Sequence, residues 1–409
     1  MNGKLKAILA YIRSNNAYYR GRIGDSDDGE EISSYSVLTR EELQKNRYSM
    51  FSKGGKAKYY SEVLIRQTSS GSTGVPVNVY WENSDFVRSN LSLWRKRMRW
   101  YGIYPYDKQV MFTLNGFGGK DNDDILYRAY PENVLMINTS LISSMEDFRE
   151  IVNMINRFNP KWMYVQPYIL EQICAVYNEN SIDTPSELKY IEVVGGKLYD
   201  VLRKKAEGVF NIYIANMYGS EEMNGIALEC PYRQVHILDD NVYVECLTKE
   251  GISETGEGEA VLTNLNNKVM PIVRYLQGDV ISIHKENKYC ECGEVMSIIE
   301  RIEGRKVDFI ELGGKKVNTQ AVFEAVAEVN NEYNDIIVEY NVVYYKNDDK
   351  LVCGVILQEG KADWYREIEK ALRGLIANKL RFIDPKLISI ERYERFEHIK
   401  VKKVLEIIE

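Results

Sequence analysis

The chain has 409 residues, of which 44% are hydrophobic and 28% are charged. This length is too great for one hydrophobic core, so we expect two or three domains, and the composition leaves little room for long disordered segments. A formal net charge of −7 argues against non-specific binding of nucleic acid, which depends on an excess of Lys and Arg.

The N-terminal segment lacks the features of an export signal. Its apolar stretch is short and interrupted by Arg13, and no small-residue cleavage site follows it. No part of the sequence approaches the roughly 18 consecutive apolar residues that a membrane-spanning helix needs. Six cysteines in a chain of this length do not suggest a disulfide framework, so we expect reduced thiols and a cytoplasmic protein.

The first hundred or so residues predict helices around one short β-prone region. Residues 1–60 read as helical and polar, with a capped helix start after Thr39. Further on, the pattern predicts strands on both sides of a Ser/Thr/Gly-rich loop and then a long helix, with the bounds Val63–Arg66, Val77–Trp81 and Asp85 to Trp100.

Residues 109–214 alternate between β-prone and helical segments. The expected strands are 109–114, 134–137, 162–165, 190–194 and 212–214, and the expected helices are 145–158, 169–177 and 199–206. Such alternation implies parallel βαβ units and a sheet that is covered on both faces. Ligands of these sheets bind at the carboxyl ends of the strands.

From about residue 225 the pattern changes to shorter β-prone segments, which suggest a meander or a small barrel. These segments are 234–238, 242–247, 259–262 and 280–284. Beyond Gly304-Arg305 lies a βαβ-like stretch of roughly 100 residues, comparable to a small domain. We therefore predict an α/β protein with two domains. The large N-terminal domain, 1–303, has parallel α/β subdomains and a small β-barrel-like region, and the C-terminal domain, 304–409, is α+β.

The loop between residues 68 and 76 is a candidate phosphate site. It places five hydroxyl side chains before Gly74, around two glycines. Glycine lets backbone N–H groups approach an anion closely, and hydroxyls add further donors. The loop is not a P-loop of the GxxxxGK[ST] type, because no Lys precedes a terminal Ser or Thr. A Ser/Gly-rich surface turn is the alternative interpretation.

Later segments add acidic and basic side chains in a suggestive order. In Met217–Glu222 a carboxylate follows an aromatic residue and a glycine, which suits a Mg²⁺ ligand beside a nucleotide. In Arg274–Asp279 an acid follows a glycine and could accept hydrogen bonds from both ribose hydroxyls. Gly304–Asp308 and the Lys-rich segment Lys400–Val404 come after them.

In this order the segments resemble the adenylate-forming superfamily, which contains acyl-CoA synthetases, adenylation domains of peptide synthetases and luciferases. The likeness is greatest to the phenylacetate–CoA ligase branch, which includes coenzyme F390 synthetase and capsule-cluster homologues. Trp100–Asp107 looks like the "GxxPGD" turn of that branch, and Asn159–Lys161 followed by Val165–Tyr168 looks like its next strand. The likeness covers nearly the whole chain.

The resemblance implies a role for each matching residue. The β- and γ-phosphates of ATP would be bound by Ser69, Gly71, Ser72, Thr73 and Gly74. The remaining nucleotide-binding positions would be Gly195, Gly196, Tyr218, Gly219, Ser220, Glu221, Asp279 and Arg305. Among these, Gly195 and Gly196 would line the adenine and acyl pocket. Tyr218 would cover the purine, and Asp279, supported by Arg305, would bind the ribose.

The catalytic residues that the resemblance implies are Glu222, which would hold Mg²⁺, and Lys400, which would reach the α-phosphate and the carboxylate of the substrate. Three positions depart from the superfamily pattern. Glu221 replaces the usual Thr or Ser, Val307 stands at the hinge position, which usually carries Asp or Lys, and Ile399 replaces the usual Gly before the catalytic lysine. Lys402 and Lys403 therefore stay open as alternatives to Lys400.

A second group of residues has the composition of a zinc site. Cys230, His236, Cys290 and Cys292 all fall in the predicted β region. Soft thiolates and an imidazole in a set of four suit tetrahedral Zn²⁺ with no open position, which predicts a structural role. Some members of the branch that the chain resembles carry a similar set. The alternative is that these are ordinary buried thiols.

The sequence thus predicts an ATP- and Mg²⁺-dependent ligase that forms an acyl-adenylate, releases pyrophosphate and passes the acyl group to a thiol, most often that of CoA. The resemblance further implies that the C-terminal domain turns about Gly304–Asp308 between the two steps. Transfer to an amine or a carrier protein, AMP transfer of the F390 synthetase type, and a non-catalytic nucleotide-binding protein stay open. So do the identity of the acid, for which the resemblance favours an aryl acid, and the choice between monomer and homodimer.

Overall fold

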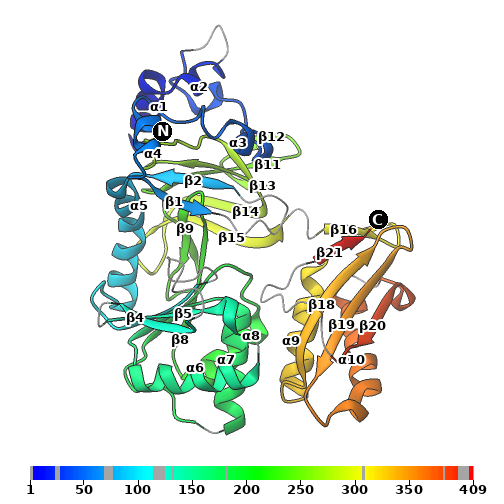
Figure 1. Cartoon of the computed structure of the whole chain (residues 1–409). Helices are drawn as coiled ribbons and strands as arrows, with labels where there is room; N and C mark the ends of the chain where they lie inside the picture. Colours follow the sequence, from blue (N-terminus) through cyan, green and yellow to red (C-terminus); the bar gives the residue numbers. More distant parts are fainter. Residues whose placement is uncertain are drawn as a thin grey trace. The chain divides into compact units, whose positions relative to one another are not determined.

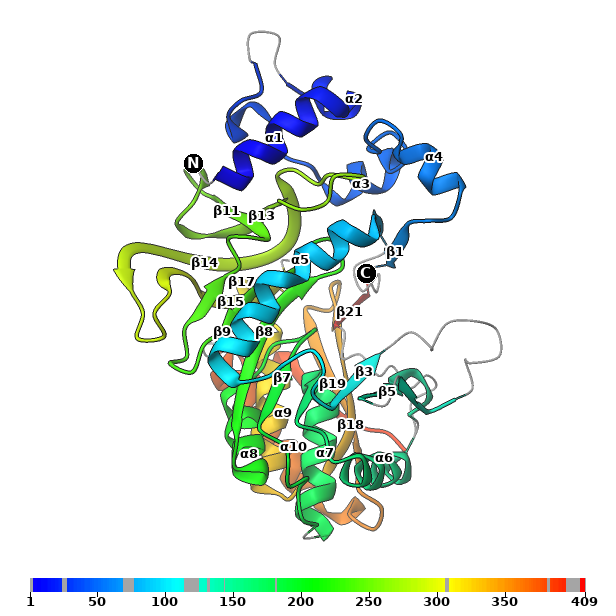
Figure 2. The same cartoon turned by 90° about the vertical axis from the view of Figure 1, so that its left-hand side faces the viewer.

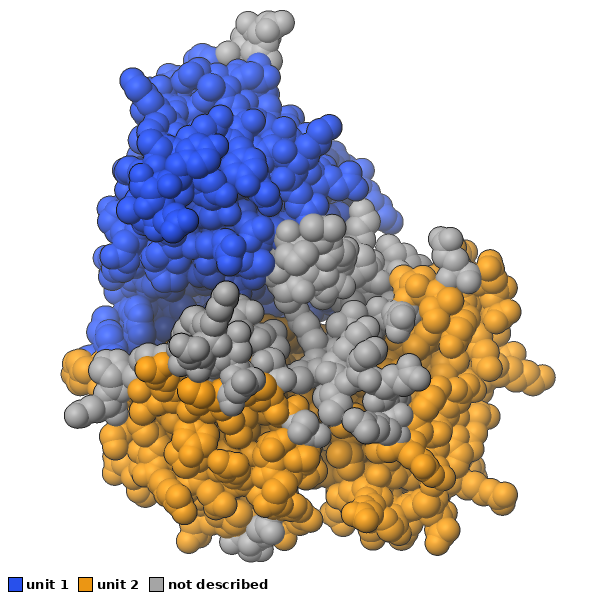
Figure 3. Space-filling model, viewed as in Figure 1, with its two compact units in different colours: residues 1–105, 215–306 blue, residues 106–214, 307–409 orange. Residues whose placement is uncertain are grey.

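The structure, a computed structural model, describes residues 3–23, 28–68, 77–113, 125–130, 133–142, 144–180, 182–305, 309–380, 383–394 and 405–408. Two compact units divide the chain, and each is assembled from two separate segments (Figure 3). Unit 1 consists of residues 1–105 and 215–306, and unit 2 of residues 106–214 and 307–409. The two units are described separately below.

The N-terminal segment of unit 1 is mainly helical, as Figure 1 shows. Its elements are α1 (Gly3–Asn15), α2 (Ala17–Arg20), η1 (Ile32–Ser34), α3 (Arg40–Asn46), α4 (Gly55–Tyr60), the antiparallel strands β1 (Ile65–Thr68) and β2 (Asn78–Trp81), α5 (Asn83–Lys96) and the π-helical turn η2 (Arg97–Tyr101). The predicted helix start after Thr39 is confirmed. The Thr39 side chain accepts a hydrogen bond from the Glu42 amide, and the Glu42 carboxylate accepts one from the Thr39 amide.

The second segment of unit 1 forms an antiparallel sheet in the order β12-β11-β13-β14-β15-β10-β9-β8. Its strands are β8 (Tyr213–Ser220), β9 (Asn224–Glu229), β10 (Val235–Ile237), β11 (Val242–Thr248), β12 (Gly251–Ser253), β13 (Gly256–Asn264), β14 (Tyr275–Tyr289) and β15 (Val295–Arg305). Helix α5 runs across β9 (Figure 2). A Cβ on Gly225 would lie 2.9 Å from Cδ1 of Leu238, so glycine permits the close packing of β9 against that side chain.

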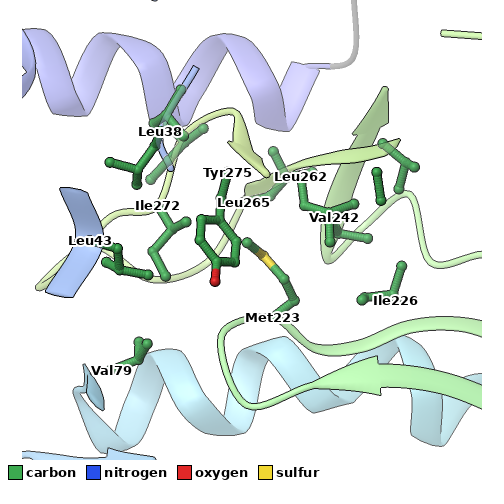
Figure 4. Packing of buried hydrophobic residues seen from close by; sticks show 14 of the residues in the cluster. Leu38, Leu43, Val79, Met223, Ile226, Val242, Leu262, Leu265, Ile272 and Tyr275 are labelled. Carbon is green, nitrogen blue, oxygen red and sulfur yellow. The ribbon is translucent and has the colours of Figure 1, made fainter. Parts of the chain in front are cut away.

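One hydrophobic core joins both segments of unit 1. Leu38 and Leu43 from the N-terminal segment pack with Met223, Ile272 and Tyr275 from the sheet segment (Figure 4). All five of these side chains are fully buried. Segments that lie far apart in the sequence are therefore fixed against each other around Tyr275, and both candidate sites described below are built on this framework.

The first segment of unit 2 contains the predicted parallel sheet. Strands β7, β6, β3 and β5 pair in parallel in that order, and β4 closes the edge in the antiparallel sense. The elements are β3 (Gln109–Thr113), β4 (Tyr127–Tyr130), β5 (Val134–Asn138), η3 (Thr139–Leu141), α6 (Met145–Phe158), β6 (Trp162–Val165), α7 (Pro167–Asn180), β7 (Tyr190–Val193) and α8 (Asp200–Phe210).

The C-terminal segment of unit 2 has its own sheet, in the order β20-β19-β18-β21, and its own core. Helix α9 packs on β18 and α10 on β20. The elements are β16 (Phe309–Leu312), β17 (Lys315–Asn318), α9 (Gln320–Glu332), β18 (Ile337–Tyr345), β19 (Lys350–Leu357), η5 (Ala362–Trp364), α10 (Tyr365–Lys379), η6 (Pro385–Leu387), β20 (Ile388–Arg392) and β21 (Leu405–Ile408).

The predicted fold class is confirmed: the chain is a mixed α/β protein with a large mixed sheet region and a small C-terminal sheet. The predicted domain boundary between residues 303 and 304 stays a prediction. None of the helices among the described residues combines the length and the apolar character that a membrane crossing requires.

Candidate active site and metal centre

Asp279 is the centre of a hydrogen-bonded group on strands β8, β14 and β15. Its Oδ2 accepts hydrogen bonds from the Tyr218 hydroxyl at 2.7 Å and from Nε2 of Gln277 at 2.6 Å. Asp279 stands opposite Arg305 in the register of β14 and β15, and Nε of Arg305 lies 3.8 Å from its Oδ1. Three of the predicted nucleotide-binding residues, Tyr218, Asp279 and Arg305, are therefore brought together within unit 1.

The phenol of Tyr218 can act only as a neutral group in this environment. Burial and the nearby Asp279 carboxylate raise its pKa well above the usual value. The phenol therefore keeps its proton at neutral pH, and it can donate that proton to Asp279 while accepting a hydrogen bond from Gln277.

Glu222 lies in the connection between β8 and β9 and is only 3% exposed. Its Oε1 accepts a hydrogen bond from the Tyr275 hydroxyl at 3.3 Å and lies 3.8 Å from Nη1 of Arg40. Burial, then the charge of Glu222, raises the pKa of Tyr275, so this phenol also stays protonated. Asn264 fixes the backbone by donating to the carbonyl oxygen of Glu222 at 3.3 Å.

The neighbouring predicted residues differ in their surroundings. Glu221 is exposed, and Oγ of Ser220 is buried without a hydrogen-bond partner in the described part of the chain. Gly219 must be glycine, because a Cβ there would come within 2.6 Å of the carbonyl oxygen of Asn224. Gly195 and Gly196 follow β7 in unit 2, and Gly195 has a φ of 71°.

Other predicted residues lie outside the described residues. These are the loop residues Ser69, Gly71, Ser72, Thr73 and Gly74, the hinge residues Val307 and Asp308, and the lysines Lys400, Lys402 and Lys403.

The predicted metal ligands come together in unit 1. One donor atom each of Cys230, His236, Cys290 and Cys292 lies within 4.8 Å of the others. The Sγ atoms of Cys230 and Cys290 are 3.9 Å apart, and Sγ of Cys292 lies 3.3 Å from Nε2 of His236. All the cysteines are free. Three sulfurs and one imidazole nitrogen in a compact, buried group fit the donor set that Zn²⁺ prefers.

Two similar turns carry the three cysteines of the metal group. Cys230 begins the turn between β9 and β10, where its amide donates to the carbonyl of Gln234 at 2.8 Å. Cys290 begins the turn between β14 and β15 and donates in the same way to Glu294 at 2.8 Å. The strand that follows the first turn, β10, pairs with the strand that follows the second, β15, at His236 and Ile298.

The protonation states of the group also suit a metal. Burial, followed by the charge of Lys96, lowers the pKa of His236 to about 4, so the imidazole is neutral and its lone pair is available. Without a cation, burial raises the pKa of the Cys230 thiol and raises that of Cys292 to about 12. A bound Zn²⁺ would reverse this effect, because thiolates that bind metals are deprotonated.

Elements around the group cover it from the side of η2. The ring of Trp100 packs against His236 with 5.6 Å between centroids. Glu294 forms ion pairs with Lys96 at 3.1 Å and with Arg99 at 2.8 Å. The end of α5 and η2 are thus attached to the turn that carries Cys290 and Cys292.

Sequence reasoning did not identify three residues that contact the candidate active site. Gln277 lies within a quoted motif, but its amide had no assigned role. Arg40 was seen only as part of a helix start, and Tyr275 only as part of the segment Arg274–Asp279. A single sequence carries no signal for the pairing of Arg40 with Glu222, because that contact depends on how two segments of unit 1 pack.

Comparison with known proteins places this geometry in context. No protein-family model matches the chain. A phenylacetate-coenzyme A ligase of Thermus thermophilus is 24% identical over 353 residues, which cover 82% of this chain and 76% of the relative. One of Pseudomonas putida is 25% identical over 362 residues, covering 84% and 77%.

A solved structure of 2-hydroxyisobutyryl-CoA ligase in the postadenylation state matches 99% of this chain and 88% of its own, with a TM-score of 0.76 and 14% identity. The fold is that of adenylate-forming enzymes, and the predicted resemblance to this superfamily is confirmed. More particularly, the chain is distantly similar in sequence to phenylacetate–CoA ligases over most of its length.

Proposed function

We propose that the chain activates a carboxylic acid with ATP as its acyl-adenylate, releases pyrophosphate, and passes the acyl group to the thiol of CoA. The observation that carries the proposal is the group formed by Tyr218, Asp279 and Arg305 in unit 1. Glu222, four residues after Tyr218, is held separately by Tyr275 and Arg40 in the same unit. Their sequence segments resemble those that the superfamily uses for the nucleotide and its metal, and the chain has the superfamily's fold. The curated relatives, both named as phenylacetate-coenzyme A ligases, support a CoA-dependent reaction with an aryl acid.

Asp279 is the proposed ribose ligand. Its Oδ2 is occupied by Tyr218 and Gln277, so the carboxylate is held in one orientation before a ligand arrives. Its Oδ1 faces Arg305 and would accept hydrogen bonds from the ribose hydroxyls. A carboxylate that is already oriented needs little reorganisation on binding, which favours affinity.

Glu222 is the proposed ligand for Mg²⁺, a cation that prefers one or two carboxylates together with substrate phosphates and water. When it is bound, Mg²⁺ neutralises charge on the phosphates and so favours attack of the carboxylate on the α-phosphorus. The loop residues from Ser69 to Gly74 are proposed to hold the leaving pyrophosphate, and Lys400 to stabilise the charge that develops during adenylation.

For Cys230, His236, Cys290 and Cys292 we propose a structural Zn²⁺ site. The arrangement supports this proposal because the four donors close a complete ligand set, which leaves no position for a catalytic water. The metal would fix the two turns to each other and, through Glu294, to the end of α5.

The test is a pyrophosphate-release assay with ATP, Mg²⁺ and a panel of aryl and aliphatic carboxylic acids, each with and without CoA. Acid-dependent release of pyrophosphate and AMP, with a thioester formed only when CoA is present, is the expected result. Release that is equal with and without CoA, and no thioester, would point to an amine, a carrier protein or AMP transfer instead. ADP as the product would contradict the proposal, and no acid-dependent release above background would favour a non-catalytic nucleotide-binding protein.

A further inference from the structure

Among the described residues, the carboxylate of Glu222 is held through one of its two oxygens. Both polar neighbours, Tyr275 and Arg40, contact Oε1, at 3.3 and 3.8 Å. Arg40 also interacts electrostatically with the Tyr275 hydroxyl and partly offsets the rise that burial causes in the pKa of that phenol, so the three side chains form one connected group. Oε2 receives no hydrogen bond from any residue in the described ranges.

Arg40 reaches this position through an extension of the sheet. Leu38 forms a parallel bridge with Tyr275: its amide donates to the carbonyl of Arg274 at 2.9 Å, and its carbonyl accepts from the amide of Leu276 at 2.9 Å. The chain then turns at Thr39 into α3, whose first residue is Arg40. The guanidinium is therefore directed toward the hydroxyl end of Tyr275 by backbone pairing and not by side-chain contact alone.

The backbone around Glu222 is equally fixed. Asn264 donates to the carbonyl of Glu222, and Asn241 donates to the carbonyls of Met223 at 2.8 Å and Gly225 at 2.6 Å. Both asparagines are fully buried. Buried amides with satisfied hydrogen bonds make such a turn rigid. Both the main chain and one carboxylate oxygen of Glu222 are thus held before any cation binds.

We propose that Arg40 is a positioning residue for the metal-binding step: together with Tyr275 it holds Oε1 of Glu222 and leaves Oε2 as the atom that binds Mg²⁺ of MgATP. This inference rests on the proposed function, because it takes Glu222 as the Mg²⁺ ligand. The positive charge of Arg40 also offsets part of the cost of burying the Glu222 side chain, which is 3% exposed.

Partners of metal ligands usually change metal affinity 10- to 100-fold when they are removed. The experiment therefore measures the affinity for ATP by calorimetry with excess Mg²⁺ and again with EDTA. The dissociation constant with EDTA divided by that with Mg²⁺ reports how much metal coordination strengthens ATP binding. The measurement does not require turnover. We expect Arg40→Gln to reduce this ratio about tenfold and Arg40→Lys to restore part of it.

Tyr275→Phe is a second variant, which removes the other partner of Oε1 of Glu222. We expect it also to reduce the ratio of the two dissociation constants. Arg47→Gln is the matched control. Arg47 follows α3 and stacks on Tyr48, 4.6 Å from the ring centroid, so its loss disturbs the same helix without removing a partner of Glu222. The control should keep the ratio of the unaltered protein.

The outcomes separate the two proposals. If the unaltered protein binds ATP with a large Mg²⁺ effect but Arg40→Gln and Tyr275→Phe leave the ratio unchanged, the role of Arg40 is wrong and the proposed function stands. If both variants lower the affinity for ATP equally with and without Mg²⁺, their role is structural and the inference is also wrong. If the unaltered protein does not bind ATP at all, the proposed function itself fails.

Discussion

Removal of the metal ligands should reveal how much the metal centre of unit 1 stabilises the fold. We expect Cys290→Ala to abolish stoichiometric Zn²⁺ binding and to lower the melting temperature. The metal-free protein should still fold, because β9, β10, β14 and β15 are paired beyond their turns and pack on a core that does not include the ligands. The metal adds its binding free energy to a fold that already exists.

The size of the effect follows from mass action. Zn²⁺ at about 1,000 times its dissociation constant stabilises the folded state by about 4 kcal/mol. For a domain of about 150–250 residues each kcal/mol shifts the melting temperature by about 2–4 °C. The expected loss is therefore about 8–16 °C, and a chelator should produce the same loss in the unaltered protein.

The assay combines zinc analysis by mass spectrometry with calorimetric unfolding. Cys246→Ala is the control, because Cys246 is a buried cysteine of the core of unit 1 whose thiol hydrogen-bonds only to backbone carbonyls in the described structure. Protein that carries no zinc after purification from zinc-containing medium would refute the reasoning. So would a Cys290→Ala variant that melts no lower than Cys246→Ala.

Other predictions test other parts of the chain. Glu245→Ala should lower the free energy of unfolding, measured in urea titrations, by about 3–5 kcal/mol. The substitution removes the counter-charge of Arg274, which is 8% exposed and donates to Glu245 through two nitrogens. A loss below about 1 kcal/mol would mean that water reaches the pair. Tyr218→Phe should raise the KM for ATP about tenfold, equivalent to about 1.4 kcal/mol, with a smaller effect on kcat, since it removes one of two donors to Asp279. Lys400→Ala should abolish acid-dependent pyrophosphate release while reaction of supplied acyl-adenylate with CoA survives; an equal loss in both half-reactions would contradict the assignment.

Local signals in the sequence accounted for most of the fold. The capping pattern at Thr39 located α3, and the alternation of apolar strands and amphipathic helices between residues 109 and 214 predicted a parallel sheet. Strands with mixed polarity were missed, among them β15, whose exposed face carries Glu300 and Arg301. The π-helical turn after α5 was also missed, because its sequence continues the helical pattern of the preceding residues.

The metal centre and the active site differ in how far the sequence could predict them. Cysteines and a histidine are rare enough that their grouping was visible before the turns were known. The supports of Glu222 are common residue types. Asn241 and Asn264 look like ordinary turn residues, yet both are fully buried and donate to backbone carbonyls in the connection between β8 and β9 or at the start of β9. Their role depends on tertiary packing, for which a single sequence holds no signal.

The two acids of the candidate active site share one arrangement that only the structure reveals. Asp279 is held through Oδ2 by Tyr218 and Gln277, and Glu222 through Oε1 by Tyr275 and Arg40. Two of these donors are phenols, and burial raises the pKa of both, so they donate without ever competing as anions. When one oxygen of a carboxylate is fixed, the orientation of its second oxygen is fixed as well. The entropy of orienting the carboxylate is therefore lost during folding and not during ligand binding. This explains why tyrosines, and not smaller hydroxyl residues, stand at these two positions: a phenol reaches an acid from within the core and fills that core at the same time.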